Sequence, residues 1–222
     1  IGPLVQTLLE NANELGDLQE LWDNDSKYKR LSTELKQYLK DHPKEKIVVF
    51  AYFRPTLKYL HERLSAEGIS SMVLVGGGSV DKNEAIEQFK RPNGPSVLLA
   101  SEVASEGIDL QFSRVVVNYD LPWNPMKVEQ RIGRIDRLGQ TSPKITIWNI
   151  FYADTIDARI HERLYMRLGI FEYALGGLEA ILGDEIKKLT IDLFRGSLSK
   201  EQEEVRISQT AQAISNLRDE EE

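Results

Sequence analysis

Apolar, β-branched runs alternate with helical patterns between residues 46 and 151, and this alternation most constrains the fold. The runs are almost continuously apolar, as strands buried on both faces must be, and cover residues 47–52, 70–75, 96–100, 114–120 and 144–151. The helical patterns between them cover residues 55–67, 80–91, 102–106 and 125–138. Strand–helix alternation produces right-handed βαβ units. The sequence therefore predicts an α/β fold, a doubly wound and mostly parallel sheet of five to six strands with helices on both faces.

Helical patterns flank this region on both sides. Residues 1–42 predict a polar N-terminal helical linker, packed on the edge of an α/β domain that spans residues 43–153. Residues 154–222 predict a C-terminal helical extension with an acidic tail, and Ser199 with Gln202 is the signature of a capping box for its last helix. The apolar residues at helical spacing in the N-terminal segment are Tyr28, Leu31, Leu35 and Leu39.

The composition limits the class of protein. The chain has 222 residues, 41% hydrophobic and 28% charged, which is typical of a soluble globular protein. It has no apolar run long enough to span a bilayer and no secretory signal pattern. The absence of cysteine excludes disulfides and thiolate chemistry and favours a cytoplasmic location. His42, His61 and His161 are far apart in the sequence, so no metal site is predicted, and the first residue, Ile1, suggests a fragment or a processed product.

Charge is distributed unevenly along the chain. The net charge of −7 argues mildly against nucleic-acid binding, and residues 200–222 are strongly acidic. Residues 126–144, however, carry only Glu129 and Asp136 as acids. The basic residues of that segment are Lys127, Arg131, Arg134, Arg137 and Lys144. The net charge therefore hides a local basic site.

The stretch "EQRIGRIDRLGQ" spaces Arg131, Arg134 and Arg137 three residues apart. Asn124 is a good N-cap and is followed by a proline, which suits the first helical position, and Gly139 suits a left-handed helix end. A helix of about 14 residues is therefore predicted, with the three arginines in one row on its surface. Its start lies just past a strand, at the carboxyl edge of the sheet, where ligands bind.

These arginines have two interpretations. They are either a solvated face paired with nearby carboxylates, or a site for phosphate. Gly133, which costs a helix about 1 kcal/mol relative to alanine, favours the second. So does the upstream segment "LLASEVASEGIDLQ", where small residues allow a backbone to approach phosphate and Ser101 or Ser105 offers a hydroxyl group.

The chain lacks the parts that hold a nucleotide triphosphate. The segment "VGGGS" is glycine-rich and follows a strand, but no Gly-Lys-Ser/Thr follows it. No lysine in the chain precedes serine or threonine, and no Asp-Glu-x-His/Asp box for magnesium occurs. No Gly-x-Gly-x-x-Gly opens a helix either, which argues against a Rossmann-type enzyme.

Four segments in order, "IVVFAYFRPTLKYL", "LLASEVASEGIDLQ", "VVVNYDLPWNP" and "EQRIGRIDRLGQ", resemble the second RecA-like lobe of superfamily-two helicases. The endings "DLPWNP" and "GRIDRLGQ" are similar to the Swi/Snf branch of DNA-translocating ATPases. Within that branch the chain most resembles the bacterial RNA-polymerase-associated type, the RapA type. The resemblance covers about residues 45–152 and fades in both flanking regions.

The resemblance implies an ATP site at the interface with an N-terminal RecA-like lobe that this chain does not contain. ATP and Mg²⁺ would be bound mainly by that lobe. Arg134 and Arg137 would be the catalytic arginine fingers that reach the γ-phosphate, because a planar guanidinium binds its spread charge bidentately. The resemblance further assigns to ATP binding Gly107, Asp109, Gln130 and Arg131. Asp109 would be a ribose ligand or a partner of a finger.

The same resemblance implies a nucleic-acid site on neighbouring loops. Its residues would be Arg54, Gly77, Ser79, Ser101 and Trp123. Arg54 and backbone N–H groups would contact one phosphate strand without reading sequence, and Trp123 would lie near DNA and couple it to the ATP site. For Trp123 the alternative is a core tryptophan beside the helix cap.

The function implied is the C-terminal motor lobe of an ATP-dependent DNA translocase or helicase. Its partners would be the N-terminal lobe and DNA, in duplex form, and the isolated chain would lack ATPase activity. The alternative is a non-catalytic scaffold that docks a partner such as RNA polymerase. The two arginines at the spacing of a finger pair favour the motor.

Overall fold

The computed structural model describes residues 22–77, 81–102, 107–162, 179–194 and 198–221. Some predicted features lie outside the described residues. They are the site residue Ser79, the alternative hydroxyl of Ser105, most of the predicted helix 102–106, and residues 1–21 of the predicted linker.

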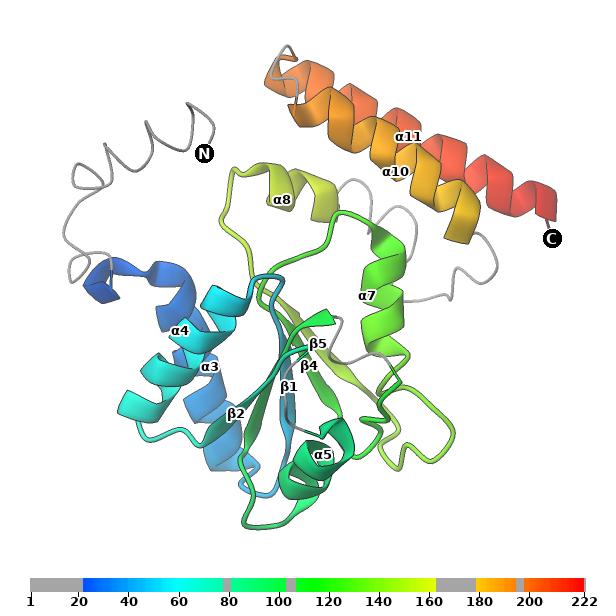
Figure 1. Ribbon diagram of the computed structural model, residues 1–222. Coiled ribbons are helices and arrows are strands. Elements are labelled where there is room, and N and C mark those ends of the chain that lie inside the picture. Colours follow the sequence, from blue (N-terminus) through cyan, green and yellow to red (C-terminus); the bar gives the residue numbers. More distant parts are fainter. Residues whose placement is uncertain (1–21, 78–80, 103–106, 163–178, 195–197, 222) are drawn as a thin grey trace.

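Five parallel strands form one sheet in the order β2-β3-β1-β4-β5. The strands are short and are β1 (Ile47–Phe50), β2 (Ser71–Leu74), β3 (Val97–Ala100), β4 (Val115–Asn118) and β5 (Thr146–Asn149). Each lies inside one of the predicted apolar runs. The prediction of a doubly wound parallel sheet is therefore confirmed, and every strand ends at the same edge of the sheet (Figure 1).

Helices cover both faces of the sheet. Alternate residues of β1 point to opposite sides, because Val49 belongs to the apolar cluster with α3 (Ser26–Asp41) and α4 (Arg54–Ala66), whereas Val48 belongs to the cluster with α5 (Lys82–Lys90). Both valines are fully buried. Figure 1 shows α3 and α4 on one side of the sheet and α5 on the other. The apolar strands have this sequence because neither face meets water.

Helix α3 belongs to the core of the sheet. Asp25 caps it by accepting a hydrogen bond from the backbone N–H of Tyr28 at 2.8 Å. Tyr28, Leu31 and Leu35 are fully buried in the cluster that also contains β1 and β4. The apolar spacing predicted for this helix thus faces the sheet.

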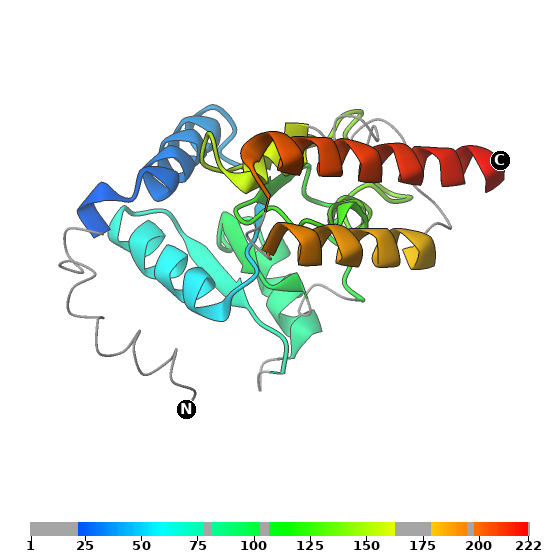
Figure 2. The same cartoon turned by 90° about the horizontal axis from the view of Figure 1, so that it is seen from above.

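The C-terminal helices pack on a second apolar cluster. It joins α7 (Pro125–Ile132) with α8 (Ile156–Ile160), α10 (Glu179–Phe194) and α11 (Lys200–Glu221). Figure 2 shows α10 and α11 running side by side. The capping box of α11 is confirmed, because the Ser199 N–H donates to Gln202 Oε1 at 2.8 Å and the Gln202 N–H donates to Ser199 Oγ at 3.3 Å.

Candidate functional site

The carboxyl edge of the sheet gathers most of the predicted site residues, because parallel strands all end there. Arg54 follows β1, Gly77 follows β2, Ser101 follows β3 and Trp123 follows β4. The arginine stretch begins on α7, which also starts from this edge (Figure 1).

Helix α7 is shorter than predicted. It begins as expected, with Asn124 Oδ1 accepting from the Met126 N–H at 3.0 Å and Pro125 in the first turn. It ends at Ile132, however, and Gly133 is its C-cap, with φ −62° and ψ −11°. The prediction of one helix over residues 125–138 is therefore wrong in its second half. The segment 133–139 forms turns, which we call the arginine turn.

Burial of one isoleucine accounts for this early end. The apolar residues of α7 face the cluster of the C-terminal helices, whereas Ile135 is fully buried in the cluster of α5 on the sheet. In a continuous helix Ile135 would lie on the same face as Ile132, which packs against the C-terminal cluster, so the chain turns after Ile132 to bury Ile135 on the sheet. The Arg134 carbonyl then accepts from the Leu110 N–H at 2.9 Å, which ties the arginine turn to the loop after β3.

The three arginines consequently do not form one row. Arg131 is 2% exposed and lies on α7, whereas Arg134 and Arg137 lie in the arginine turn. Arg134 is half-buried and Arg137 is exposed. Within the described part of the chain, no hydrogen bond or ion pair holds the side chain of Arg134.

Arg131 is bound inside the lobe. Its Nη1 donates to Asn118 Oδ1 at 2.8 Å and to the Asp120 carbonyl at 3.1 Å, and its Nη2 lies 3.8 Å from a carboxylate oxygen of Glu102. The guanidinium also lies over the ring of Phe50, 5.2 Å from its centroid. These contacts link α7 to the ends of β1, β3 and β4. The assignment of Arg131 to ATP binding stays a prediction, and its contacts indicate a positioning role.

Two of the residues predicted for the ATP site, Arg137 and Asp109, lie together at the surface. Arg137 forms an ion pair with Asp109, and the two side chains are 48% and 59% exposed. The contact fits one of the two roles predicted for Asp109, that of a partner to Arg137, whose role as an arginine finger stays a prediction. Gly107 has a φ of +77°, a conformation that favours glycine, and brings the chain back from the loop toward Asp109. Gln130 lies half-buried on α7.

The residues predicted to contact nucleic acid divide into two groups. Arg54 donates a hydrogen bond to the Gly76 carbonyl, and Gly77, with a φ of +73°, follows at once. Ser101 is buried next to them, and its N–H donates to the Leu74 carbonyl at 3.0 Å. The start of α4 and the ends of β2 and β3 thus meet at one corner of the sheet.

Trp123 lies apart from that corner. Its Nε1 donates to Asp157 Oδ1 of α8 at 2.8 Å, and its half-buried ring packs on the cluster of the C-terminal helices. The structure therefore shows the packed tryptophan that was the alternative for this residue.

Sequence reasoning missed a set of polar residues beneath the arginines. Asn118 is fully buried at the end of β4, and its Nδ2 donates to Asn149 Oδ1 on β5 at 2.9 Å. Lys127 pairs with Glu102 at 2.7 Å. The available signal was an asparagine that ends an otherwise apolar strand, in "VVVN" and in "TIWN". Sequence reasoning also missed Tyr52 and Phe53, each 62% exposed, whose rings stack edge to face after β1.

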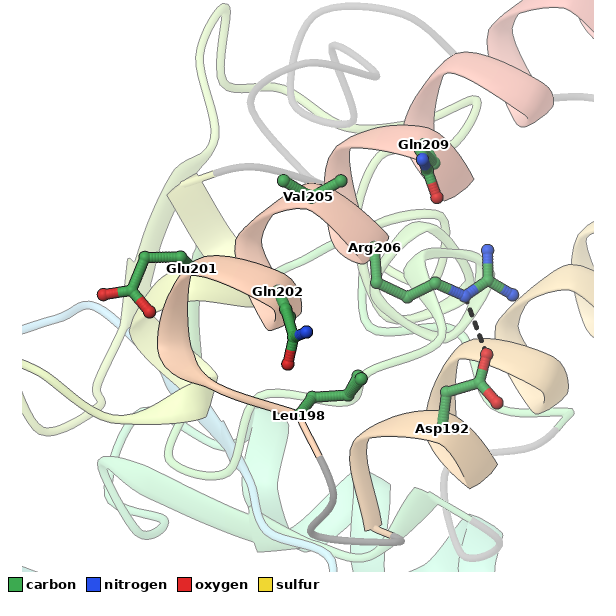
Figure 3. Close-up of a pocket in the computed structure, with 7 residues that line it drawn as sticks. All are labelled: Asp192, Leu198, Glu201, Gln202, Val205, Arg206 and Gln209. Carbon is green, nitrogen blue, oxygen red and sulfur yellow. Dashed lines mark hydrogen bonds and ion pairs between the residues drawn. The ribbon is translucent and has the colours of Figure 1, made fainter.

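A groove lies elsewhere, between α10 and the beginning of α11 (Figure 3). Its volume is about 490 Å³, and the ion pair of Arg206 with Asp192, at 2.7 Å, lies across it. Its lining residues include none of the predicted site residues and are Asp192, Leu198, Glu201, Gln202, Val205, Arg206 and Gln209. Its shape therefore supports no argument about the arginines.

The residues that the structure describes contain no group of three His, Asp or Glu side chains arranged to hold a metal ion. Among them, too, no helix has the length and apolar character needed to cross a membrane.

Comparisons with known proteins agree with the observed fold. The family model described as "Helicase conserved C-terminal domain" matches residues 26–139, from α3 to the end of the arginine turn. The protein named "Uncharacterized ATP-dependent helicase YqhH" of Bacillus subtilis (strain 168) is 41% identical over 138 residues, which is 62% of this chain and 24% of that protein. The chain thus spans about a quarter of this relative.

Solved structures show the same fold. The C-terminal part of the Fun30 ATPase domain matches with a TM-score of 0.60 and 25% identity, covering 72% of this chain and 51% of that one. The helicase domain of Hef from Pyrococcus furiosus matches with a TM-score of 0.52 and 23% identity, over 71% of this chain and 37% of that one. The second match shows the fold alone. The chain spans about half of the first structure, and a smaller share of the second.

Proposed function

Because this chain belongs to the family of helicase conserved C-terminal domains, we propose that it is the C-terminal motor lobe of an ATP-dependent DNA translocase or helicase. The observation that carries this proposal is the exposed pair of loops at the carboxyl edge. They present Arg134, Arg137 and Asp109 to solvent beside a fixed Arg131, in a chain whose sequence has no phosphate cradle. Such a surface is suited to complete an ATP site that another lobe begins.

The arginine turn would supply positive charge during ATP hydrolysis. Water attacks the γ-phosphorus, the bond to the β-phosphate oxygen breaks, and negative charge spreads over the γ-oxygens and the leaving oxygen. The exposed Arg137 reaches outward from the lobe, and Asp109 restrains its guanidinium until a phosphate competes for it. Arg134 is half-buried, and no hydrogen bond or ion pair among the described residues holds its side chain, so it would bind the same phosphoryl group. Bound Mg²⁺ would neutralise part of the phosphate charge from the N-terminal lobe.

The corner formed by Arg54, Gly77 and Ser101 would bind the phosphate backbone of DNA. The Arg54 guanidinium is fixed at the Gly76 carbonyl, and Gly77 leaves the backbone open beside it. An exposed glycine backbone can bind phosphate without reading bases, and so can a fixed positive charge. Ser79 and Trp123 stay predicted nucleic-acid contacts, and Trp123 lies apart from this corner, against α8. The assignment to the Swi/Snf branch, and to duplex DNA as the substrate, rests on the sequence segments that resemble that branch.

The test is the ATPase activity of the full-length protein with duplex DNA, single-stranded DNA, RNA or no nucleic acid. We expect duplex DNA to stimulate hydrolysis and the isolated 222-residue chain to be inactive. Activation by RNA alone would contradict the DNA assignment, and robust turnover by the isolated chain would contradict the two-lobe site.

A second candidate is a non-catalytic scaffold that docks a partner such as RNA polymerase. The groove between α10 and α11, with Val205 56% exposed beside it, favours this candidate. An inactive full-length protein that still binds such a partner through the C-terminal helices would support it over the motor. The solvent-facing arginine turn has no use in a scaffold, which is why the motor is preferred.

A further inference from the structure

A chain of polar contacts runs along the carboxyl edge of the sheet from α7 to the C-terminal extension. Arg131 on α7 donates to Asn118 Oδ1 at 2.8 Å, and Asn118 Nδ2 donates to Asn149 Oδ1 at 2.9 Å. Asn149 Nδ2 in turn lies 3.4 Å from Nε2 of His161, which follows α8 directly. The contacts thus connect α7, β4, β5 and α8 in that order.

The direction of these hydrogen bonds is fixed. Arg131 has only donors, so the Asn118 amide must present its oxygen to it and its nitrogen to Asn149. The same reasoning orients the Asn149 amide, whose nitrogen then faces His161. His161 must accept through Nε2, so its ring must be neutral. Burial lowers the pKa of His161, with Glu162 opposing the shift, and this favours the neutral ring. Each amide therefore has one orientation that satisfies both neighbours.

The environment makes this orientation matter. Asn118 is fully buried, Arg131 is 2% exposed, and Asn149 and His161 are half-buried. In a buried network the loss of one partner leaves the others with unpaired polar atoms, so satisfied networks hold their members rigidly. The position of the Arg131 guanidinium is therefore set in part by a side chain of the extension, two asparagines away.

Apolar contacts and a second hydrogen bond tie the same two elements together. Met126 and Val128 of α7 share the cluster that contains Ile160 of α8 and the inner faces of α10 and α11. Trp123, just before α7, donates to Asp157 of α8 at 2.8 Å. Helix α7 is thus held between the sheet and the extension.

Arg131 in turn fixes the arginine turn. The Arg134 N–H donates to the Arg131 carbonyl at 3.3 Å, and the Gly133 N–H donates to the Glu129 carbonyl at 2.8 Å. A displacement of Arg131 therefore moves the start of the turn that carries Arg134 and Arg137. A misplacement of about 1 Å at a catalytic group can lower a rate by about 10²-fold.

We propose that Asn149 and His161 are positioning residues for ATP hydrolysis, through which the C-terminal extension aligns the arginine turn by way of Asn118 and Arg131. The inference rests on the proposed motor function. It gives the segment after β5 a role in the chemistry, although neither side chain reaches the phosphate-facing surface formed by Arg137 and Asp109. Packing of the C-terminal extension on α7 therefore also aligns Arg134 and Arg137.

The test uses the full-length protein and four substitutions. Asn149→Ala and His161→Leu break the chain of contacts, whereas His161→Gln keeps an acceptor oxygen for Asn149. Asn83→Ala, at an exposed position of α5 on the other side of the sheet, is the matched control for the asparagine. His42→Leu, exposed after α3, is the control for the histidine. Steady-state kinetics with saturating duplex DNA gives kcat and KM for ATP, and thermal unfolding identifies a temperature at which every variant is folded.

We expect Asn149→Ala and His161→Leu to lower kcat by about 10- to 100-fold with little change in KM, because the misplacement acts on the transition state. His161→Gln should retain most of the activity, and both controls should match the parent. If Asn149→Ala does not fold, the comparison of His161→Leu with His161→Gln decides the question.

Three outcomes would overturn the inference. An unchanged kcat in both disruptive variants would remove the positioning role, as would a rise in KM alone or a failure of His161→Gln to differ from His161→Leu. A parent protein without any ATPase activity would instead refute the proposed function, and this inference with it. Normal activity in the parent and in all variants would refute only the positioning role.

Discussion

Helix α7 and the arginine turn contain arginines of the same motif at equal spacing, yet the two segments differ in nearly every physical respect. Arg131, on α7, is 2% exposed and held by Asn118, whereas the side chain of Arg137, six residues later, is 48% exposed and paired with an exposed carboxylate. The first arginine is surrounded by its own lobe. The second faces outward from it. Equal spacing in sequence therefore does not indicate equal roles.

The difference shows that a site of this kind needs a rigidly held backbone and arginine side chains that are exposed at the surface. A guanidinium that must bind a transient charge has to keep its donors available, and this is possible only at the surface. Its backbone must nevertheless be fixed within a fraction of an ångström. The buried contacts of α7 satisfy the second requirement, and the break at Gly133 allows the first.

The largest expected effect lies in the arginine turn. Arg137→Ala or Arg134→Ala in the full-length protein should lower kcat by roughly 10³-fold or more, as loss of an arginine finger does, while ATP binding is largely retained. The unfolding midpoint should hardly change, because the Asp109 pair is exposed and contributes little stability. Single-turnover kinetics, nucleotide titration and thermal unfolding check this. Equal loss of binding and hydrolysis would show that the turn has a structural role.

Arg131→Ala should lower the stability of the protein, and its effect on kcat, which acts through the position of the arginine turn, should be smaller than that of Arg137→Ala. It leaves the buried Asn118 amide without its donor and weakens the charge balance at Glu102, so we expect a loss of about 3 kcal/mol of folding free energy. Chemical denaturation of the full-length protein measures this loss. Arg131→Lys is the matched control, since it keeps the charge but not the planar fork, and it should recover only part of the stability. Full stability in Arg131→Ala would erase the contrast with Arg137.

Substitution of the two glycines of the arginine turn should produce a smaller difference in stability than substitution of the arginines. Gly139 has a φ of +104°, where an alanine is strained, so Gly139→Ala should cost about 1–2 kcal/mol. Gly133 has ordinary helical angles, but an added Cβ would lie only 3.3 Å from the Glu129 carbonyl oxygen, a tight contact that requires a small shift of the backbone, so Gly133→Ala should lower stability by less than Gly139→Ala does. Denaturation midpoints of the two variants provide the comparison. A larger cost at Gly133 would mean that the turn depends on its small size and not on its backbone angles.

The sheet could be predicted from the sequence because strands that are buried on both faces are apolar at nearly every position. Each strand is apolar throughout, and the start of α7 could be placed because Asn124 and Pro125 act locally. The end of α7 could not be placed, because the helical pattern continues past Gly133 and only the packing of Ile135 on the far cluster stops it. Local rules do not contain that information.

The polar contacts beneath the arginines depend even more on tertiary structure. Asn118 and Asn149 are opposite each other because β4 and β5 pair in a register that aligns these two residues. Neither register nor strand order follows from two asparagines that are far apart in the chain. The charged residues of the loops were recognised from motifs, whereas the residues that hold them required the fold.

The smallest expected effect is a pH dependence of the free energy of unfolding, which comes from His161 at the far end of the contacts that hold α7. Burial lowers the pKa of His161 below its value in an unfolded chain, near 6.5, so the unfolded state takes up the proton first as pH falls. Stability is therefore complete above about pH 6.5 and declines below it, by an amount that His161→Gln should remove. Denaturation of parent and variant between pH 5 and 8 tests this, with His42→Gln as the exposed control. The same decline in parent and His161→Gln would show that the proton goes elsewhere.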